Sequence, residues 1–374
     1  MTYCTTAGRK GVKVEFDDGK EFLMKSNEMI EIGEEIGEEE AFVKVVHGRN
    51  CQNCLLPKPS LKCSACKEIY YCSRECQKKD FKIFHKWECR AFKKCRPNIP
   101  NSAIRLFARL LYAIKAANME IEFSNPRPRL DGVNRLSSNR KRMTEKDLAL
   151  HSLLAKGIHN VVDNQFLLDI DSMIELVCIL STNSLGLIGD DGQEIIGRAL
   201  FPKTLSFINH SCYPNAHVVY NRKGHAVLRA IRQICPGQQI FISYIDIFQN
   251  RIARQKQLSD SYHFICDCTA CSGNVENPDF SQDYQNVAKM LENQEWNELM
   301  QASITISKRI ENSFGPFHPE VGIHLLKALK CASLVLDDFT FLSKLGQKTC
   351  QILAVTHKDT LLYENARSLV RSLG

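Results

Sequence analysis

The most chemically distinctive part of this chain is a group of seven cysteines and one histidine that fall within thirty-nine residues. They are Cys51, Cys54, Cys63, Cys66, Cys72, Cys76, His85 and Cys89. Thiolates and imidazoles are preferred Zn²⁺ ligands, and two cysteines separated by two residues can reach one tetrahedral ion from a tight turn. Eight ligands suffice for two closed sites, which stabilise structure, whereas catalytic zinc needs an open coordination position. We therefore expect a zinc-stabilised module here and the chemistry elsewhere.

The spacing of these ligands also predicts how they are shared. Cys72 and Cys76 are one helical turn apart, as are His85 and Cys89. An interleaved arrangement follows, with Cys51, Cys54, Cys72 and Cys76 on one ion and Cys63, Cys66, His85 and Cys89 on the other. A disulfide framework is the alternative, but we find no secretory signal, and a histidine takes one ligand position.

Length and composition narrow the class of protein. A chain of 374 residues has room for two or three domains, and 44% apolar with 24% charged residues is ordinary for a globular protein. No run approaches the ~18 apolar residues of a membrane span, so we expect no membrane segment. Seventeen cysteines without a signal peptide indicate metal binding in a reducing compartment.

The positive charge is concentrated around the cysteine-rich segment. Residues 51–100 hold 12 Lys/Arg and 4 Asp/Glu, whereas residues 1–50 hold 7 and 11. One interpretation is an electrostatic contact surface for nucleic acid or an acidic partner. The other is a solvated basic face that offsets thiolate charge. We favour the second because the segment has no base-reading motif.

The pattern of apolar residues predicts the elements that position these groups. Strands are expected at residues 12–16 and 41–46, and helices at residues 77–96 and 104–116. Residues 124–142 contain two prolines, a glycine, serines and a basic run, which indicates a linker or an exposed loop.

The second half of the chain changes character. Residues 145–180 are periodic like helices, and strands are expected at 226–231 and 239–244. After Cys271 the chain is helical to its end, with a pair of helices predicted near residues 320–337 and 341–355. Two or three imperfect copies suggest paired-helix repeats.

A second cysteine group lies near residue 268. Cys266, Cys268 and Cys271 supply three thiolates, and a structural zinc needs a fourth ligand. Cys212 is the best candidate, although spacing alone leaves Cys178, Cys235 and Cys331 open. Cys212 belongs to the polar segment Asn209–Asn215, which suits a loop that binds a polar ligand, or else a capped turn.

These motifs together resemble a known family. Tyr70–Gln77 and His85–Cys89 look like a MYND zinc finger. Asn209–Asn215, Ile242–Tyr244 and the group around Cys268 look like a SET domain with its post-SET zinc site. A SET domain split by such a finger is typical of the SET and MYND domain-containing (SMYD) protein lysine methyltransferases, in which Cys212 would complete a third zinc site.

The resemblance implies an α+β fold. A SET-domain β-fold is interrupted by the MYND zinc finger, followed by a post-SET zinc site and by C-terminal α-helical repeats of the TPR-like kind. The implied parts are residues 1–47 (N-terminal part of the SET domain), 48–94 (MYND finger), 95–180 (helical linker or insert), 181–248 (SET core), 249–275 (post-SET) and 276–374 (helical domain).

The resemblance also implies an activity, methyl transfer from S-adenosylmethionine to a lysine of a histone or another protein. Tyr244 would be catalytic, and Tyr244 and Tyr262 would shape the lysine channel. The cofactor would contact Lys10, Gly11, Asn183, Asn209, His210, Tyr244 and Phe264. The reaction needs a neutral amine, and an apolar aromatic channel lowers the pKa of lysine from its free value of about 10.4. No protein nucleophile or catalytic metal is required, so all three zinc ions would be structural.

Further expectations concern partners. The resemblance implies protein substrates that bear lysine, a proline-rich peptide on the finger, and a monomer located in nucleus and cytoplasm; the basic face could add a nucleic-acid contact. The family's N-terminal Gly-x-Gly is here Gly8-Arg9-Lys10-Gly11. This departure motivates the alternative of a non-enzymatic transcriptional adaptor that binds peptides through the finger and the helical repeats.

Overall fold

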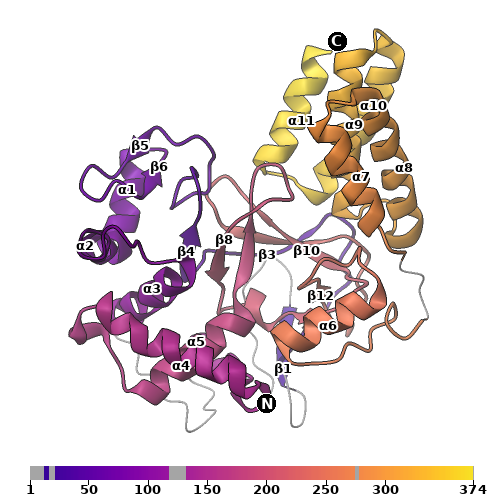
Figure 1. The fold of residues 1–374 in the computed structure, drawn as a ribbon. Coiled ribbons are helices and arrows are strands. Elements are labelled where there is room, and N and C mark those ends of the chain that lie inside the picture. Colours follow the sequence, from indigo (N-terminus) through magenta and orange to yellow (C-terminus); the bar gives the residue numbers. More distant parts are fainter. Residues whose placement is uncertain (1–11, 17–21, 118–131, 274–277, 374) are drawn as a thin grey trace.

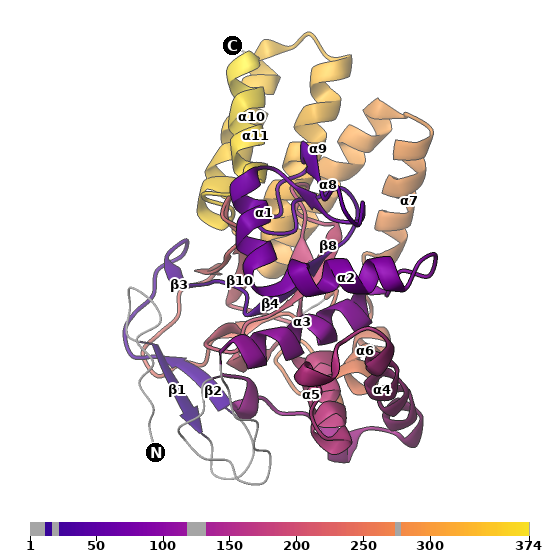
Figure 2. The ribbon, with the colours of Figure 1, turned by 90° about the vertical axis from the view of Figure 1, so that its left-hand side faces the viewer.

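The computed structural model describes residues 12–16, 22–117, 132–273 and 278–373 (Figure 1). Lys10 and Gly11 lie outside these ranges. Small sheets occupy the centre, and helices gather at the two ends of the molecule (Figures 1 and 2). None of the described helices is both long and apolar enough to span a bilayer.

Two central sheets join segments from either side of the cysteine-rich insert. β4 (Val43–Val46), just before the insert, pairs antiparallel with β8 (Ile195–Leu200), which in turn pairs with β7 (Leu185–Ile188). In the other sheet β11 (Ala226–Ala230) lies between β3 (Glu35–Glu39) and β10 (Ala216–Tyr220). The fold is therefore one β-structure that the insert interrupts.

Close packing of β4 against β8 depends on a glycine. A Cβ atom at Gly197 would lie 2.2 Å from the backbone oxygen of Val45, a distance that no side chain can take. Val45 itself is fully buried. The register of the two strands therefore needs a residue without a side chain at this position.

The chain crosses itself at a short parallel pair of strands. β9 (Asn209–His210) runs parallel to β12 (Phe241–Ile242). The backbone N–H of Ser211 donates to the carbonyl of Ile242 at 3.0 Å and extends the contact. The strand predicted at 239–244 is thus only two residues long, and side chains bind the backbone at and beyond it: Asn215 Oδ1 accepts the N–H of Phe241, and His210 Nδ1 accepts that of Tyr244.

The cysteine-rich insert forms a compact module beside β4 (Figure 2). It contains β5 (Leu61–Lys62), β6 (Tyr70–Tyr71), α1 (Arg74–Asp80) and α2 (Lys86–Lys94). The helix predicted at 77–96 begins three residues earlier, where the Ser73 hydroxyl accepts the backbone N–H of Cys76. A π-helical turn at Phe81–His85 separates α1 from α2.

Three helices cover the lower side of the sheets in Figure 1: α3 (Ser102–Ala116), α4 (Glu145–Gly157) and α5 (Ile170–Asn183). α3 packs on β4 and buries most of its length, including Phe107 and Leu110. α5 continues three residues beyond the predicted helical stretch and so places Asn183 at a helix end.

The C-terminal helices form a separate bundle at the top of Figures 1 and 2. After α6 (Arg251–Tyr262) come α7 (Ser281–Glu292), α8 (Trp296–Phe314), α9 (Pro319–Val335), α10 (Phe339–Thr356) and α11 (Leu361–Ser372). Each packs on the next in sequence, as expected for paired-helix repeats. The predicted helices 320–337 and 341–355 correspond to α9 and α10. β1 (Val12–Phe16) and β2 (Phe22–Ser26) form a two-stranded ribbon far from this bundle.

Candidate active site and metal centres

The structure gathers the predicted ligands into three groups of four. Within each group all ligand atoms lie within 4.8 Å of one another. Measured pairs are Cys54–Cys72 at 3.4 Å, Cys72–Cys76 at 3.5 Å, Cys63–Cys89 at 3.9 Å, Cys66–His85 Nε2 at 3.6 Å and Cys212–Cys271 at 3.6 Å. Tetrahedral zinc with bonds of about 2.3 Å has ligand edges of about 3.8 Å, so the donor sets fit this metal.

The thiols of the first group lie close enough to affect one another's ionisation. A hydrogen bond from Cys54 lowers the pKa of Cys51 to about 5, whereas the same pair raises the pKa of the Cys54 thiol. Thiolates this close repel one another unless a cation lies between them. The site is therefore suited to a divalent ion.

A buried ion network supports the histidine of the second group. Glu88 lies 3.4 Å from Nδ1 of His85, the ring nitrogen opposite the one that faces Cys66. Arg109 of α3 is buried and contacts Glu88 at 2.5 Å and Asp80 at 2.7 Å. This arrangement fixes the ring orientation of a metal-binding histidine. It also attaches the finger to α3.

The third group connects the strand crossing to the segment after α6. Cys212 lies two residues after β9, while Cys266, Cys268 and Cys271 lie more than fifty residues later. A metal ion bound here would hold the crossing against the post-SET segment. Cys178, Cys235 and Cys331, which spacing alone had left open, do not belong to the cluster among the described residues.

Tyr244 lies where the crossing meets this segment. Its hydroxyl donates to the backbone carbonyl of Ile208 at 2.5 Å. The ring of Tyr262 lies 4.9 Å from that of Tyr244, and the Tyr262 hydroxyl donates to the Tyr244 carbonyl at 3.1 Å. Burial raises the pKa of Tyr262, so its phenol stays neutral. Together the rings and the oxygens form a short aromatic wall with acceptors for an amine.

His210 is buried directly behind Tyr244. Its Nδ1 accepts the backbone N–H of Tyr244 at 3.0 Å, and its Nε2 lies 3.2 Å from Sγ of Cys212. Its ring also lies 6.1 Å from that of Phe264. Burial lowers the pKa of His210 to about 4. Both ring nitrogens are used inside the protein, so a cofactor contact at this residue would come from its backbone.

Asn183 lies at the end of α5, near the segment that leads to β9. Its side-chain amide donates to the carbonyls of Ser137 at 2.7 Å and Ile179 at 2.8 Å. The backbone carbonyl of Asn183 accepts a hydrogen bond from the hydroxyl of Ser206 at 3.2 Å. Of the predicted cofactor residues, Asn209, His210, Tyr244 and Phe264 come together around the crossing, and Asn183 reaches it through Ser206.

A buried carboxylate, which the sequence pattern does not reveal, binds the backbone of residues 203–205, in the segment that leads to β9. Glu39, at the end of β3, accepts the backbone N–H groups of residues 203, 204 and 205 at 2.9, 2.9 and 3.1 Å. Burial raises its pKa, and these three donors oppose the shift. Nothing in the run Glu38-Glu39-Glu40 distinguishes the residue, because only the fold brings residues 203–205 to it.

A cleft of about 860 Å³ opens between the central sheets, α6 and the C-terminal bundle. Tyr244 and Tyr262 line it, whereas Asn183, Asn209, His210 and Phe264 do not. Neighbours of two of these residues, Ser184 and His263, do line it, so the predicted cofactor residues lie next to the cleft wall that contains Tyr244. Other residues that line the cleft include Ile195, Arg198, Asp246, Phe248, Tyr284 and Glu320.

The cleft has an acidic residue that sequence reasoning did not single out. Glu320, near the start of α9, accepts the side-chain amide of Gln193 at 2.8 Å. Burial raises its pKa to about 7 despite this hydrogen bond. No local motif marks it, since Gln193 comes from the β7–β8 turn, more than a hundred residues away.

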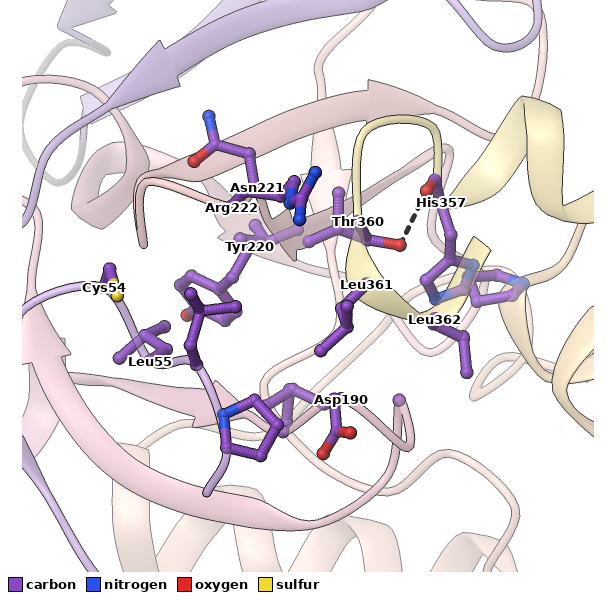
Figure 3. Close-up of a pocket in the computed structure, with 18 of the residues that line it drawn as sticks. Cys54, Leu55, Asp190, Tyr220, Asn221, Arg222, His357, Thr360, Leu361 and Leu362 are labelled. Carbon is purple, nitrogen blue, oxygen red and sulfur yellow. Dashed lines mark hydrogen bonds between the residues drawn. The ribbon is translucent and has the colours of Figure 1, made fainter. Parts of the chain in front are cut away.

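A second, smaller pocket of about 110 Å³ lies where the finger, the central sheets and α11 meet (Figure 3). Leu55, Tyr220 and Leu361 face its interior, with Asp190 and Arg222 at its edge. Neither Tyr244 nor Tyr262 reaches it. It lies at the junction of three parts, apart from the two tyrosines.

Comparison with known proteins agrees with this architecture. The family model described as "SET domain" matches residues 21–245. Human "Histone-lysine N-methyltransferase SMYD3" is 31% identical over 75% of this chain and 67% of its own length. Human "N-lysine methyltransferase SMYD2" is 34% identical over 62% of this chain and 53% of its own length, and Xenopus laevis "N-lysine methyltransferase SMYD2-B" is 34% identical over the same shares. This chain thus spans about two thirds of the first relative and about half of the others. The α+β fold class expected from the sequence is confirmed.

Proposed function

Because this chain belongs to the SET and MYND domain-containing family, we propose that it is an S-adenosylmethionine-dependent protein-lysine N-methyltransferase acting on histones or other proteins. The observation that carries the proposal is the position of Tyr244. It lines a large cleft, which suits a protein segment, and its backbone N–H donates to His210 of β9, among the predicted cofactor residues. A lysine bound in the cleft beside Tyr244 would thus lie close to a cofactor bound by these residues.

The residues of the site fit the requirements of methyl transfer. The bound cofactor supplies an electrophilic methyl group on a sulfonium. An amine that loses its water against the adjoining rings of Tyr244 and Tyr262 has a lowered pKa, because desolvation disfavours the ammonium and favours the neutral amine that can attack. The Tyr244 hydroxyl and the Ile208 carbonyl orient the amine and stabilise the positive charge that spreads in the transition state.

The proposal includes three structural zinc ions, one in each four-ligand group. The four sulfur or nitrogen atoms of each group, all within 4.8 Å of one another, support it. We also propose S-adenosylmethionine as the cofactor, lysine-bearing proteins as partners, and a nuclear and cytoplasmic location. The names of the relatives support lysine-bearing proteins as partners, the match to the SET family supports the cofactor, and family resemblance alone supports the location.

Two experiments test the proposal. The zinc-loaded chain, incubated with labelled S-adenosylmethionine and a proteome extract, should transfer label to protein lysines that mass spectrometry can identify. Calorimetry should show one cofactor site per chain. Peptide binding by a chain that neither binds the cofactor nor transfers methyl groups would reject the proposal in favour of a non-enzymatic adaptor.

A further inference from the structure

The hydrogen bonds of His210 determine its tautomer. A backbone N–H can only donate, so Nδ1, which accepts from Tyr244, carries no proton. The neutral ring must then carry its proton on Nε2, which faces Cys212 Sγ at 3.2 Å. The sulfur is therefore the acceptor. One ring thus receives a hydrogen bond from the backbone of Tyr244 and donates another to a cysteine of the third ligand group.

We propose that His210 is a positioning residue that connects the third metal group to Tyr244 through these two hydrogen bonds. This inference rests on the proposed methyltransferase function for its catalytic half only. On the metal side, the Nε2–H donor would stabilise negative charge on the Cys212 thiolate. On the other side, the same ring fixes the peptide of Tyr244.

The surroundings of Tyr244 show why its hydrogen bond to His210 matters. Its N–H is bound by His210, its carbonyl by the Tyr262 hydroxyl at 3.1 Å, and its own hydroxyl by the Ile208 carbonyl at 2.5 Å. Methyl transfer depends on alignment, because small misplacements of reacting groups cost large factors in rate. Loss of one of three constraints should therefore affect the rate more than the binding of cofactor.

The burial of His210 supports a role inside the protein. The ring is packed against Tyr244 at 5.4 Å and Phe264 at 6.1 Å between ring centres, and the residue is only 7% exposed. Cys212 is fully buried. A thiolate in such a place needs hydrogen-bond donors as well as a metal, because outer donors tune the charge of a ligand.

Two substitutions separate the two hydrogen bonds. Asparagine can place its amide group where Nδ1 lies, so His210→Asn keeps the acceptor for Tyr244 and loses the donor to Cys212. Glutamine can place its amide where Nε2 lies, so His210→Gln keeps the donor to Cys212 and loses the acceptor. His210→Phe retains a ring for packing and loses both. All three are compared in the full-length, zinc-loaded chain.

The measurements are zinc release into excess chelating dye, the rate of methyl transfer at saturating S-adenosylmethionine, and KM for the cofactor. For His210→Asn, one of three zinc equivalents should leave at least about tenfold faster than in the wild type, with a smaller change in rate. For His210→Gln, zinc release should stay close to wild type, while the saturated rate falls at least about tenfold with little change in KM. His210→Phe should show both defects.

Two results would overturn the proposal. One is that the His210→Asn and His210→Gln variants lose zinc and activity in parallel, which would indicate that the ring acts through packing alone. The other is that neither changes zinc release or rate. If the wild-type chain transfers no methyl group, the proposed function fails, but the zinc-release half still decides whether His210 supports the metal group.

Discussion

Two histidines lie beside cysteine groups in this molecule, and their surroundings differ. His85 faces Cys66 as a ligand of the finger, and the buried carboxylate of Glu88 and the guanidinium of Arg109 lie behind it. His210 faces Cys212 from outside its four-cysteine group, and the backbone of Tyr244 lies behind it. The first arrangement ends in a structural ion network. The second ends at the residue that we assign to catalysis.

The comparison shows that metal groups with similar ligands can have different roles. One kind stabilises the finger, and the other lies beside the proposed catalytic residue. In the finger, the ligands and their supports come from one stretch of chain plus α3, and none of them reaches the large cleft. In the third group, Cys212 lies two residues after β9, and the other three cysteines lie four to nine residues after α6. Metal loss should consequently affect activity strongly at one place and weakly at the other.

The largest expected effect contrasts one ligand from each region. Cys268→Ser should lose one zinc equivalent and reduce methyl transfer at least about 100-fold, because the crossing is no longer held against the post-SET segment. Cys72→Ser should also lose one zinc equivalent but reduce transfer by less than about tenfold. Zinc content and initial rates, measured on both variants, check this. Equal loss of activity in the two variants would contradict a closer link of the third metal group to the active site.

A smaller effect tests the ion network of the finger. Arg109→Met leaves Asp80 and Glu88 buried without their cation and should lower the free energy of unfolding by about 3–5 kcal/mol. Its control is Lys79→Ala, which removes only an exposed pair with Glu75 at 3.5 Å and should cost less than about 1 kcal/mol. Urea unfolding at fixed zinc concentration measures both. Similar midpoints for the two variants would contradict the role of the network.

The smallest expected effect concerns two carboxyl groups, Glu88 and Glu320, whose pKa values shift in opposite directions. Although burial opposes it, Arg105 and Arg109 hold the pKa of Glu88 well below its usual range. Burial instead raises the pKa of Glu320 to about 7. Between pH 4.5 and 7 the native state therefore keeps a proton on Glu320 that the unfolded state has lost. The contribution of Glu320 to stability is thus fully present below pH 4.5 and is lost as pH rises through 7.

Glu320→Gln should remove this pH dependence, because the amide stays neutral and can still accept from Gln193. Relative to wild type, the variant should gain stability from pH 5 to pH 8 by about 2 kcal/mol, allowing for partial solvent contact. Melting temperatures across that range measure the difference. Parallel curves for the two proteins would refute the assignment.

Local spacing was sufficient to predict part of this molecule. The interleaved ligand sets of the finger follow from pairs two or four residues apart, and the structure brings those same sets together. The strands predicted at 12–16, 41–46 and 226–231 from alternation and composition are observed as β1 (Val12–Phe16), β4 (Val43–Val46) and β11 (Ala226–Ala230). Such patterns succeed because the interacting residues lie close in sequence, where the geometry of turns and helices limits the possibilities.

The remaining features depend on contacts between distant segments. Glu39 meets residues 203–205, Gln193 meets Glu320, and Arg109 meets Asp80 across long separations in the sequence. The strand at 239–244 is short because residue 244 turns toward His210. Spacing left the fourth ligand of the third group open, and the family resemblance selected Cys212. The roles assigned to Lys10 and Gly11 stay predictions, since both lie outside the described residues.

Methyl transfer by the Tyr244→Phe variant tests the central claim most directly. Phenylalanine keeps the ring against Tyr262 and the backbone hydrogen bonds to His210 and Tyr262, but it removes the hydroxyl at the Ile208 carbonyl. We predict unchanged zinc content and cofactor binding, with a rate of transfer to protein lysines about 100-fold below wild type. Full retention of methyl transfer would contradict the assignment of this site.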